Sequence, residues 1–161
     1  MSKEKPRFED FLMCVGPDDI AFVKHMHEFF TKNGCEVNIK DAKNGYVVSY
    51  VHTGTKKTVV NYVFRKKGLI MRIYGDNVGS YQDFIDVLPD GMADAIEKAP
   101  ICKRLADTEK CNSRCPMGYI FALRGQEQKK CRYNGFMFLL DDESKPYVKE
   151  FVEREMRERC A

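Results

Sequence analysis

Four segments between residues 35 and 74 have the pattern of β-strands joined by short turns, and this region most constrains the fold. They are residues 35–40, 46–52, 58–64 and 69–74, which alternate apolar with polar side chains or are rich in Val, Ile, Tyr and Phe. Asn44-Gly45 is the strongest hairpin signal, because both residues tolerate the positive φ of a type I′ turn. Successive strands with short turns predict an antiparallel meander.

Helical spacing of apolar side chains flanks this meander on both sides. The expected helices are an N-terminal one over residues 18–33, a central one over 77–99 interrupted at Pro89, and a C-terminal one after Asp141. Residues 119–124 and 130–140 predict a further strand hairpin. We therefore predict one α+β domain over residues 1–161, with an antiparallel sheet of about six strands packed by N-terminal, central and C-terminal helices.

The order helix, strand meander, helix, strand hairpin and terminal helix resembles several families of small bacterial α+β domains of unknown function. The resemblance covers most of the chain, rests on the order of elements, and implies a fold and a bacterial source. It implies no chemistry, because a fold alone does not define a function. A cysteine-rich insertion at residues 100–131 lies outside the shared pattern.

Four of the seven cysteines lie within that insertion: Cys102, Cys111, Cys115 and Cys131. Four thiolates satisfy the tetrahedral coordination of a structural zinc site, and thiolates also suit iron–sulfur centres. Residues 100–133 contain eight basic and three acidic residues, and this surplus would offset the negative charge of a zinc tetrathiolate. We expect one Zn²⁺ ion here. The chain has no Cys-x2-Cys knuckle, so free thiols and disulfides remain alternatives.

A candidate ligand site lies on the strands of the meander. Arg72 interrupts the apolar strand 69–74, and several tyrosines lie on this strand and its neighbours. The candidate ligand-binding residues are Arg72, Tyr46, Tyr50, Tyr62 and Tyr74. An arginine among aromatic rings suits a small anionic or planar molecule. The alternative is an arginine at a sheet edge whose stem packs while its guanidinium stays in water.

Basic residues are concentrated on the strands and predict a second class of partner. Residues 55–75 contain six basic and no acidic residues, whereas residues 76–99 contain six acidic residues and Lys98. Nucleic-acid phosphates would contact Lys56, Lys57, Arg65, Lys66, Lys67, Lys129, Lys130 and Arg132. The net charge of only +3 and the acidic central helix make this the less favoured partner. Oligomeric state has no signal in the sequence.

The sequence also bears on catalysis, secretion and membrane insertion. The chain has no GxGxxG, no GxxxxGK[ST] and no HExxH, and its carboxylates have the spacing of solvated helix faces, so a non-enzyme is favoured. The first residues are charged and lack an apolar signal region, and no apolar run approaches the length of a membrane span. We expect a cytoplasmic protein with reduced cysteines and no membrane partner.

These observations predict a cytosolic binding or regulatory module with a structural zinc site and a small anionic or planar ligand. The alternatives are a nucleic-acid-binding protein that uses the basic strands, and an enzyme of unidentified class.

The zinc hypothesis makes a stoichiometric prediction. Changing any one of Cys102, Cys111, Cys115 or Cys131 to Ser should lower the zinc content of the purified protein, because a closed site uses all four thiolates. Metal analysis with thiol counting measures this. The matched controls Cys14→Ser, Cys35→Ser and Cys160→Ser should leave the zinc content unchanged, and metal-free wild-type protein would contradict the hypothesis.

Overall fold

The structure is a computed structural model that describes residues 4–161. Its main sheet contains five antiparallel strands in the order β1-β2-β3-β4-β7, and β5 and β6 form a separate two-stranded sheet. The strands are β1 (Cys35–Ala42), β2 (Gly45–His52), β3 (Lys57–Arg65), β4 (Gly68–Ile73), β5 (Tyr119–Leu123), β6 (Gln126–Lys130) and β7 (Phe136–Leu139). The predicted α+β fold with an antiparallel sheet is confirmed.

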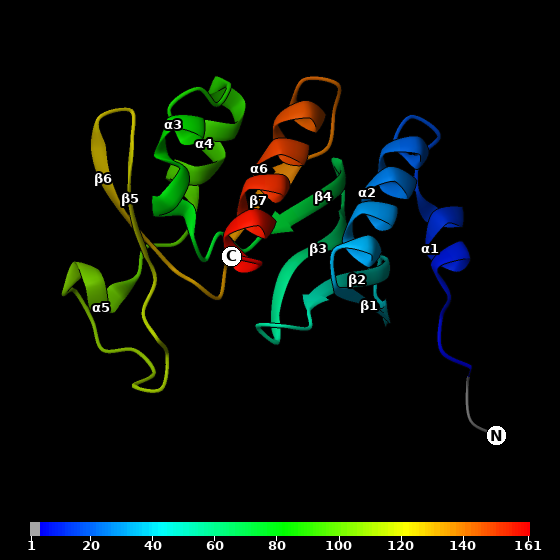
Figure 1. The fold of residues 1–161 in the computed structure, drawn as a ribbon, viewed down its shortest axis with the longest axis horizontal. Helices are drawn as coiled ribbons and strands as arrows, with labels where there is room; N and C mark the ends of the chain where they lie inside the picture. The colour runs from blue at the N-terminus through cyan, green and yellow to red at the C-terminus, as the bar shows by residue number, and fades with distance from the viewer. Residues whose placement is uncertain (1–3) are drawn as a thin grey trace.

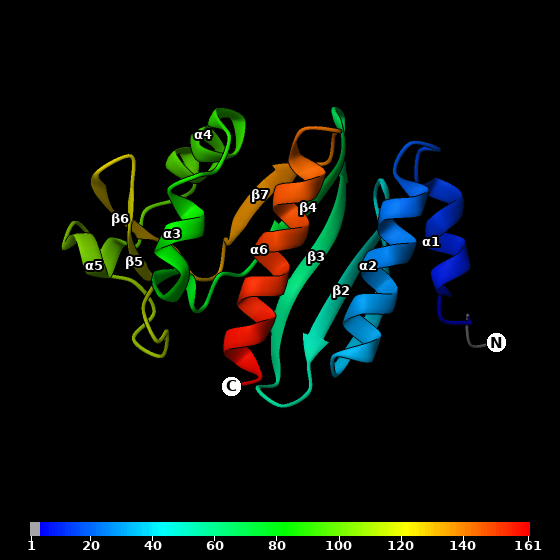
Figure 2. The ribbon, with the colours of Figure 1, turned by 45° about the horizontal axis from the view of Figure 1, so that its top comes forward.

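The helices are α1 (Phe8–Cys14), α2 (Ile20–Lys32), η1 (Val78–Tyr81), α3 (Gln82–Ile85), α4 (Asp90–Lys98), α5 (Lys103–Ala106) and α6 (Ser144–Arg159). α2 and α6 cover one face of the main sheet, α4 lies against β7, and α5 lies beside the small sheet of β5 and β6 (Figure 1). Figures 1 and 2 show α2 and α6 lying across the sheet, with α1 outside α2 and the α3–α4 region beyond α6. Within residues 4–161, no helix is long and apolar enough to cross a membrane.

Strand register defines the face that the helices bury. Val48 pairs with Tyr62, Tyr62 with Met71, and Met71 with Phe138, so these side chains form one row across four strands. All four are at most 2% exposed. Tyr50, in the neighbouring row, stacks on Phe30 of α2 at 4.4 Å between ring centroids. This continuous apolar face is the core of the protein.

The opposite face of the sheet, which we call the outer face, has a polar row. Ser49 pairs with Asn61, Asn61 with Arg72, and Arg72 with Met137. Because successive side chains alternate between faces, each of these residues points away from the buried row. All four are partly exposed.

The hairpin turns differ in detail from the predicted type. β1 and β2 do form a hairpin, but Lys43-Asn44 connects the strands, and of Asn44 and Gly45 only Gly45 has a positive φ, at +96°. The turn with two consecutive positive φ values is Arg124-Gly125, at +52° and +77°, between β5 and β6. The guanidinium of Arg124 is ion-paired with Asp90, Asp94 and Glu97 of α4.

The predicted strand 130–140 is divided between the two sheets. Its first residue ends β6, and residues 136–139 form β7, which pairs with β4. The break occurs at Gly135, where φ is +59° and an added Cβ would lie 2.8 Å from the carbonyl oxygen of Ile73. Only glycine fits this close approach. The chain passes from the small sheet to the main sheet over residues 131–135.

Two buried tyrosines of the core, Tyr50 and Tyr62, differ in whether their hydroxyl groups are hydrogen-bonded, and this difference predicts different effects on stability. The hydroxyl of Tyr62 is buried without a hydrogen-bond partner in the described chain, whereas that of Tyr50 is 2.8 Å from Nδ1 of His27. Tyr62→Phe should therefore leave the free energy of unfolding unchanged or raise it, while Tyr50→Phe should lower it by about 0.5–1.5 kcal/mol. Urea denaturation measures both values. The reverse order of the two effects would show that the hydroxyls are misassigned.

Candidate functional site

A pocket of about 310 Å³ opens where the β2–β3 turn meets the segment between β6 and β7. We call it the Asp76 pocket, and its lining residues are Lys57, Thr58, Tyr74, Asp76, Pro116, Arg132 and Tyr133. An adjoining pocket of about 280 Å³ shares Lys57, Asp76 and Arg132 with it. Residues far apart in the sequence therefore converge at one end of the sheet.

A buried carboxylate lies behind this pocket. Glu155 of α6 is fully buried and accepts hydrogen bonds from the hydroxyl of Tyr81 at 2.6 Å and from Nε of Arg159 at 2.8 Å. The backbone N–H and the side-chain amide of Asn77 donate to it at 3.0 and 2.9 Å. Both carboxylate oxygens are thus satisfied, which compensates for the loss of water around a buried charge.

Arg159 connects α6 to the end of the sheet. Its side chain is 2% exposed, and its guanidinium donates to the carbonyl oxygens of Lys57, Thr58 and Tyr74 at 2.9–3.2 Å. It also lies 3.3 Å from the carboxylate of Asp76. One guanidinium therefore binds the first residues of β3 and the end of β4 at the same time.

Asp76 is the acidic residue that lines the pocket. Its Oδ1 accepts hydrogen bonds from Arg132 at 2.9 Å and from the hydroxyl of Tyr119 at 3.0 Å. Nε of Arg132 donates to the carbonyl oxygen of Met117, and its guanidinium lies 4.8 Å from the centre of the Tyr119 ring. We call Asp76, Arg132, Glu155 and Arg159 the ionic network; its two acids and two arginines balance each other.

The tyrosines of the network act as hydrogen-bond donors. Burial raises the pKa of Tyr81 far above its ordinary value, and the charge of Glu155 adds to the shift. Burial raises the pKa of Tyr119 in the same way, with Asp76 as the second cause. Both phenols therefore keep their protons across the physiological range, which suits a fixed structural wall better than proton transfer.

Lys57 is the cation of the pocket that the ionic network leaves unused. Its side chain is exposed and forms no ion pair within residues 4–161. Tyr74 is partly exposed and Tyr133 is 62% exposed, so aromatic surface is available in the same pocket. The pocket is lined by a lysine without an ion-pair partner among the described residues and by two tyrosines, a combination suited to binding a planar anion.

The structure does not bring the five candidate ligand-binding residues together. Tyr50 and Tyr62 are fully buried in the core face, whereas Arg72 and Tyr74 lie on the outer side of β4 and just beyond it. Tyr46 lines a third pocket, beside the residues that precede and begin α1. The cause is strand alternation: Tyr50 and Tyr62 share their face with Val48 and Val60 rather than with Arg72.

The ligand site predicted from the sequence does not include any residue of the ionic network. Arg132 belongs instead to the basic residues predicted to contact nucleic acid. A signal for two residues of the network does exist. Glu155 and Arg159 are four residues apart and fall on the same stripe of α6 as Val148 and Val152, which are fully buried. Charged residues at apolar positions of an amphipathic helix indicate a buried polar contact.

The four cysteines of the zinc hypothesis differ in their surroundings. Cys102 is buried, Cys115 and Cys131 are partly exposed, and Cys111 is exposed. Over residues 4–161 the side chains of His, Cys, Asp and Glu form no group of three or more that could hold a metal ion. Burial opposes ionisation of Cys102, but hydrogen bonds from the backbone amides of Leu105, Gly118 and Arg104 lower its pKa overall. Zinc binding stays a prediction.

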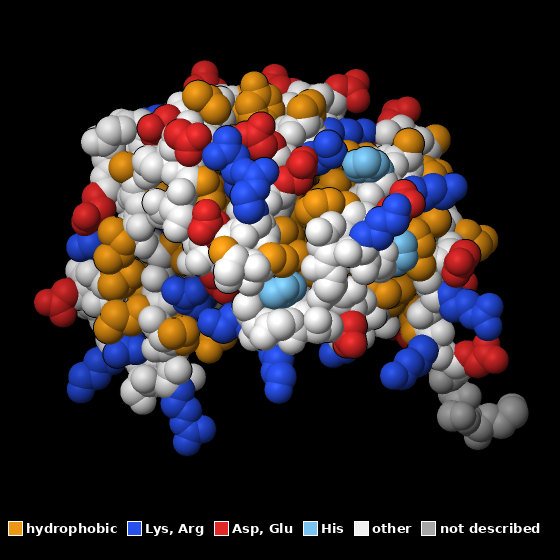
Figure 3. Space-filling view, in the orientation of Figure 1, with side chains coloured by type: hydrophobic (Ala, Val, Ile, Leu, Met, Phe, Trp, Pro, Cys, Tyr) orange, Lys and Arg blue, Asp and Glu red, His pale blue; other side chains and the backbone are white. Residues whose placement is uncertain are grey.

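The basic residues expected to contact nucleic acid are dispersed by the fold. Lys130 is 4% exposed and donates to the carbonyl oxygens of Glu97 and Ala99, and Arg132 belongs to the ionic network. Lys129 is paired with Glu127. The remaining basic residues lie at the two opposite ends of β3 and in the turns next to them. Figure 3 shows basic and acidic side chains interspersed over the helical face, with no continuous basic track there.

Comparison of the chain with models of known protein families, with curated proteins and with solved structures gives no match. The resemblance in element order therefore stays a prediction, and the function is argued from the geometry of the site.

The buried pair Glu155–Arg159 predicts a large and specific loss of stability. Glu155→Leu or Arg159→Met alone should lower the free energy of unfolding by about 3–5 kcal/mol. The first leaves the buried Arg159 with Asp76 as its only acid, and the second leaves the buried Glu155 without a cation. The double variant should lose less than the sum of the two single variants. Chemical denaturation measures all three.

A surface pair on the same helix is the matched control. Lys149 and Glu153 have the same spacing and lie 3.4 Å apart, but both are substantially exposed. Glu153→Leu should change the free energy of unfolding by no more than about 0.5 kcal/mol. Equal losses for Glu153→Leu and Glu155→Leu would contradict a special role for the buried pair.

Proposed function

We propose that the protein is a non-catalytic binding module whose Asp76 pocket takes a small planar anion. The observation that carries the proposal is the free ammonium group of Lys57, which lines the same pocket as Tyr74 and Tyr133. The arginines beside it are neutralised by Asp76 and Glu155. Lys57 is therefore the charge that a ligand can neutralise.

The size and rigidity of the pocket support a small ligand. A volume of about 310 Å³ is at the lower end of the range of small-molecule pockets. The ionic network fixes Asp76 and the backbone of Lys57, Thr58 and Tyr74 before any ligand arrives. A preorganised wall lowers the entropic cost of binding.

The chemistry of the lining residues supports binding rather than catalysis. The pocket contains no His, Cys or Ser, and its one carboxylate, Asp76, is already bonded to Arg132 and Tyr119. No lining group has an arrangement typical of a nucleophile with its base. A binding role is the simplest use of a free cation beside two aromatic rings.

We further propose a cytoplasmic location and a zinc ion held by the insertion. All seven cysteines are free thiols, and reduced thiols are typical of the cytoplasm. The zinc ion would fix the loop between α5 and β5, whose residue Pro116 lines the Asp76 pocket. Metal binding would in that case also shape the ligand site.

The proposal predicts charge-dependent binding at Lys57. The planar anion 2-naphthoate should bind with measurable heat in isothermal titration calorimetry, and Lys57→Ala should weaken this binding by about tenfold or more, because a charge-assisted contact is lost. Tyr133→Ala should also weaken it through lost stacking. The neutral amide 2-naphthamide should bind less well than 2-naphthoate.

Lys66→Ala is the matched control, since Lys66 is an exposed lysine in the turn at the other end of β3. It should bind 2-naphthoate like the wild type. Equal binding by Lys57→Ala and the wild type would reject the Asp76 pocket as the site.

A further inference from the structure

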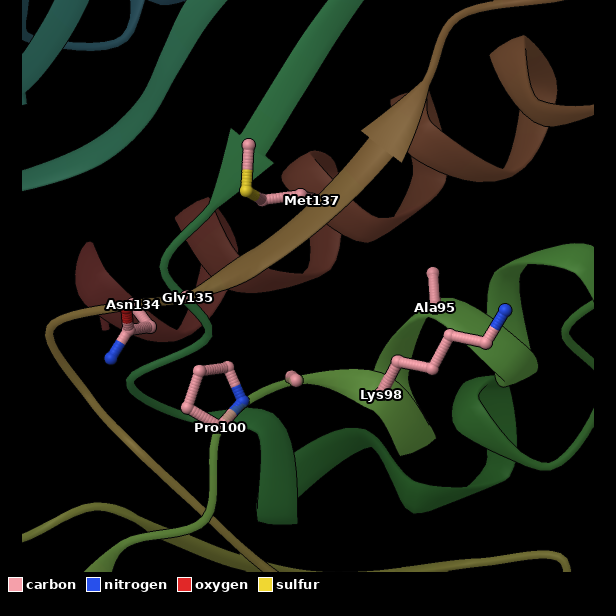
Figure 4. A pocket seen from close by; sticks show the side chains of 7 residues that line it. Ala95, Lys98, Pro100, Asn134, Gly135 and Met137 are labelled. Atoms are coloured by element: carbon pink, nitrogen blue, oxygen red, sulfur yellow. The ribbon is translucent and has the colours of Figure 1, made fainter.

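The main sheet ends in β1 on one side and in β7 on the other, and the two edge strands differ in what lies beside them. Figure 4 shows Met137 of β7 on one side of a cavity, with Ala95 and Lys98 of α4 on the other. In the described part of the chain, β1 pairs only with β2. An edge strand presents a row of unpaired backbone N–H and C=O groups, which is a template for pairing with another strand.

The hydrogen-bond pattern identifies the residues of β1 that face this edge. The N–H of Thr53 donates to the carbonyl oxygen of Gly34 at 2.9 Å, so these two opposed residues form a hydrogen-bonded pair. Hydrogen-bonded and non-hydrogen-bonded pairs alternate along an antiparallel ladder. The backbone of Asn38 is therefore bonded to β2, whereas the N–H and C=O groups of Val37 and Ile39 point to the free edge.

The side chains of this segment are arranged by face. Val37 and Ile39 are partly buried and pack against the core on the helix side. Glu36, Asn38 and Lys40 are exposed on the outer face. Glu36 and Lys40 lie about 13 Å apart along the strand. Neither of them forms an ion pair with any of residues 4–161.

The positions of these two charges distinguish the possible partners of the edge. Charged side chains ordinarily protect an edge strand from pairing with other chains. Glu36 and Lys40 carry opposite charges and lie symmetrically about Asn38. A second copy of the same strand, running antiparallel, therefore places Lys40 opposite Glu36 and Glu36 opposite Lys40. The edge is complementary in charge to itself.

The direction of the backbone groups restricts the register of such a pair. Only the odd-numbered residues of β1 face the edge, so the two-fold axis must pass through a residue position rather than between two residues. An axis at Glu36 or at Lys40 places like charges opposite each other. An axis at Val37 or at Ile39 places both charges opposite uncharged residues. Among these positions, only the axis at Asn38 gives two pairs of opposite charges.

We propose that β1 is a homodimer interface, at which β1 of a second copy pairs antiparallel about a two-fold axis at Asn38. Val37 of each copy exchanges backbone hydrogen bonds with Ile39 of the other. Glu36 of each copy pairs with Lys40 of the other at non-hydrogen-bonded positions, where opposed side chains are closest. The two sheets become one continuous sheet of ten strands, five from each copy. The interface is independent of the Asp76 pocket, because no residue of β1 lines that pocket.

Charge reversal tests both the partner and the register. The full chain should show a monomer–dimer equilibrium in analytical ultracentrifugation at concentrations up to about 0.5 mM. Glu36→Lys and Lys40→Glu should each weaken this association by about tenfold or more, because each places like charges opposite one another at two positions. An equal mixture of the two variants should form a heterodimer, since the reversals restore opposite charges at both positions. The double variant Glu36→Lys/Lys40→Glu should self-associate like the wild type.

Amide hydrogen exchange tests the backbone pairing. At about 0.5 mM chain, the N–H groups of Val37 and Ile39 should exchange more slowly in the wild type than in Glu36→Lys, because only the dimer bonds them. The N–H of Asn38, which is bonded to β2 within the chain, should be equally protected in both proteins. The matched control is Lys98→Glu at the opposite edge of the sheet, an exposed position that should leave the association unchanged.

Three results would overturn the proposal. Wild-type protein that remains monomeric up to about 0.5 mM would reject a second copy as the occupant of the edge. Equal association of the wild type and both single variants, or a mixture of the two that does not associate, would reject the register. Equal exchange of Val37 and Ile39 in the wild type and in Glu36→Lys would reject β1 as the interface. Circular dichroism confirms that each variant is folded, which the exposure of Glu36 and Lys40 predicts.

Discussion

The buried contact between Glu155 and Arg159 is the interaction on which the end of the molecule around the Asp76 pocket depends. The pair spans one turn of α6, and its remaining hydrogen bonds reach η1, both ends of the β3–β4 region and Asp76. A buried ion pair contributes little net stability by itself, because desolvation offsets most of the attraction. Its effect here is positional: it fixes the C-terminal turn of α6 against the polar ends of the strands.

Residues 133–135 border two hollows of the surface, with Tyr133 lining the Asp76 pocket and Asn134 and Gly135 lining a cavity of about 330 Å³ beside α4. The segment crosses from the small sheet to β7 and is anchored by Arg132 on one side and by the close approach of Gly135 to Ile73 on the other. Lys57, the unpaired cation that lines the Asp76 pocket, is exposed.

Sequence reasoning succeeded where a local pattern determines structure. The alternation in residues 35–74 placed β1–β4 because each strand buries one face, so that side-chain period reflects the fold directly. The prediction of one strand over residues 130–140 was wrong, because residues 131–135 leave the strand conformation. Gly135 packs closely against the carbonyl oxygen of Ile73, and no local sequence pattern indicates this distant contact. Tyr50 and Tyr62 were misplaced since tyrosine suits both a wet face and a core. Glu155 was recognisable only as a charge on an apolar stripe; its partner Tyr81 is 74 residues away in the sequence.

The central claim is that the ionic network is a rigid wall rather than a solvated surface cluster. Amide hydrogen exchange of Asn77 tests it most directly, because this N–H lies outside the strands and donates to Oε1 of Glu155 at 3.0 Å. The account predicts exchange nearly as slow as that of Met71 in the centre of the sheet, so that opening requires global unfolding, and much faster exchange in Glu155→Leu. Fast exchange of Asn77 in the wild type, at the rate of an exposed loop, would contradict it.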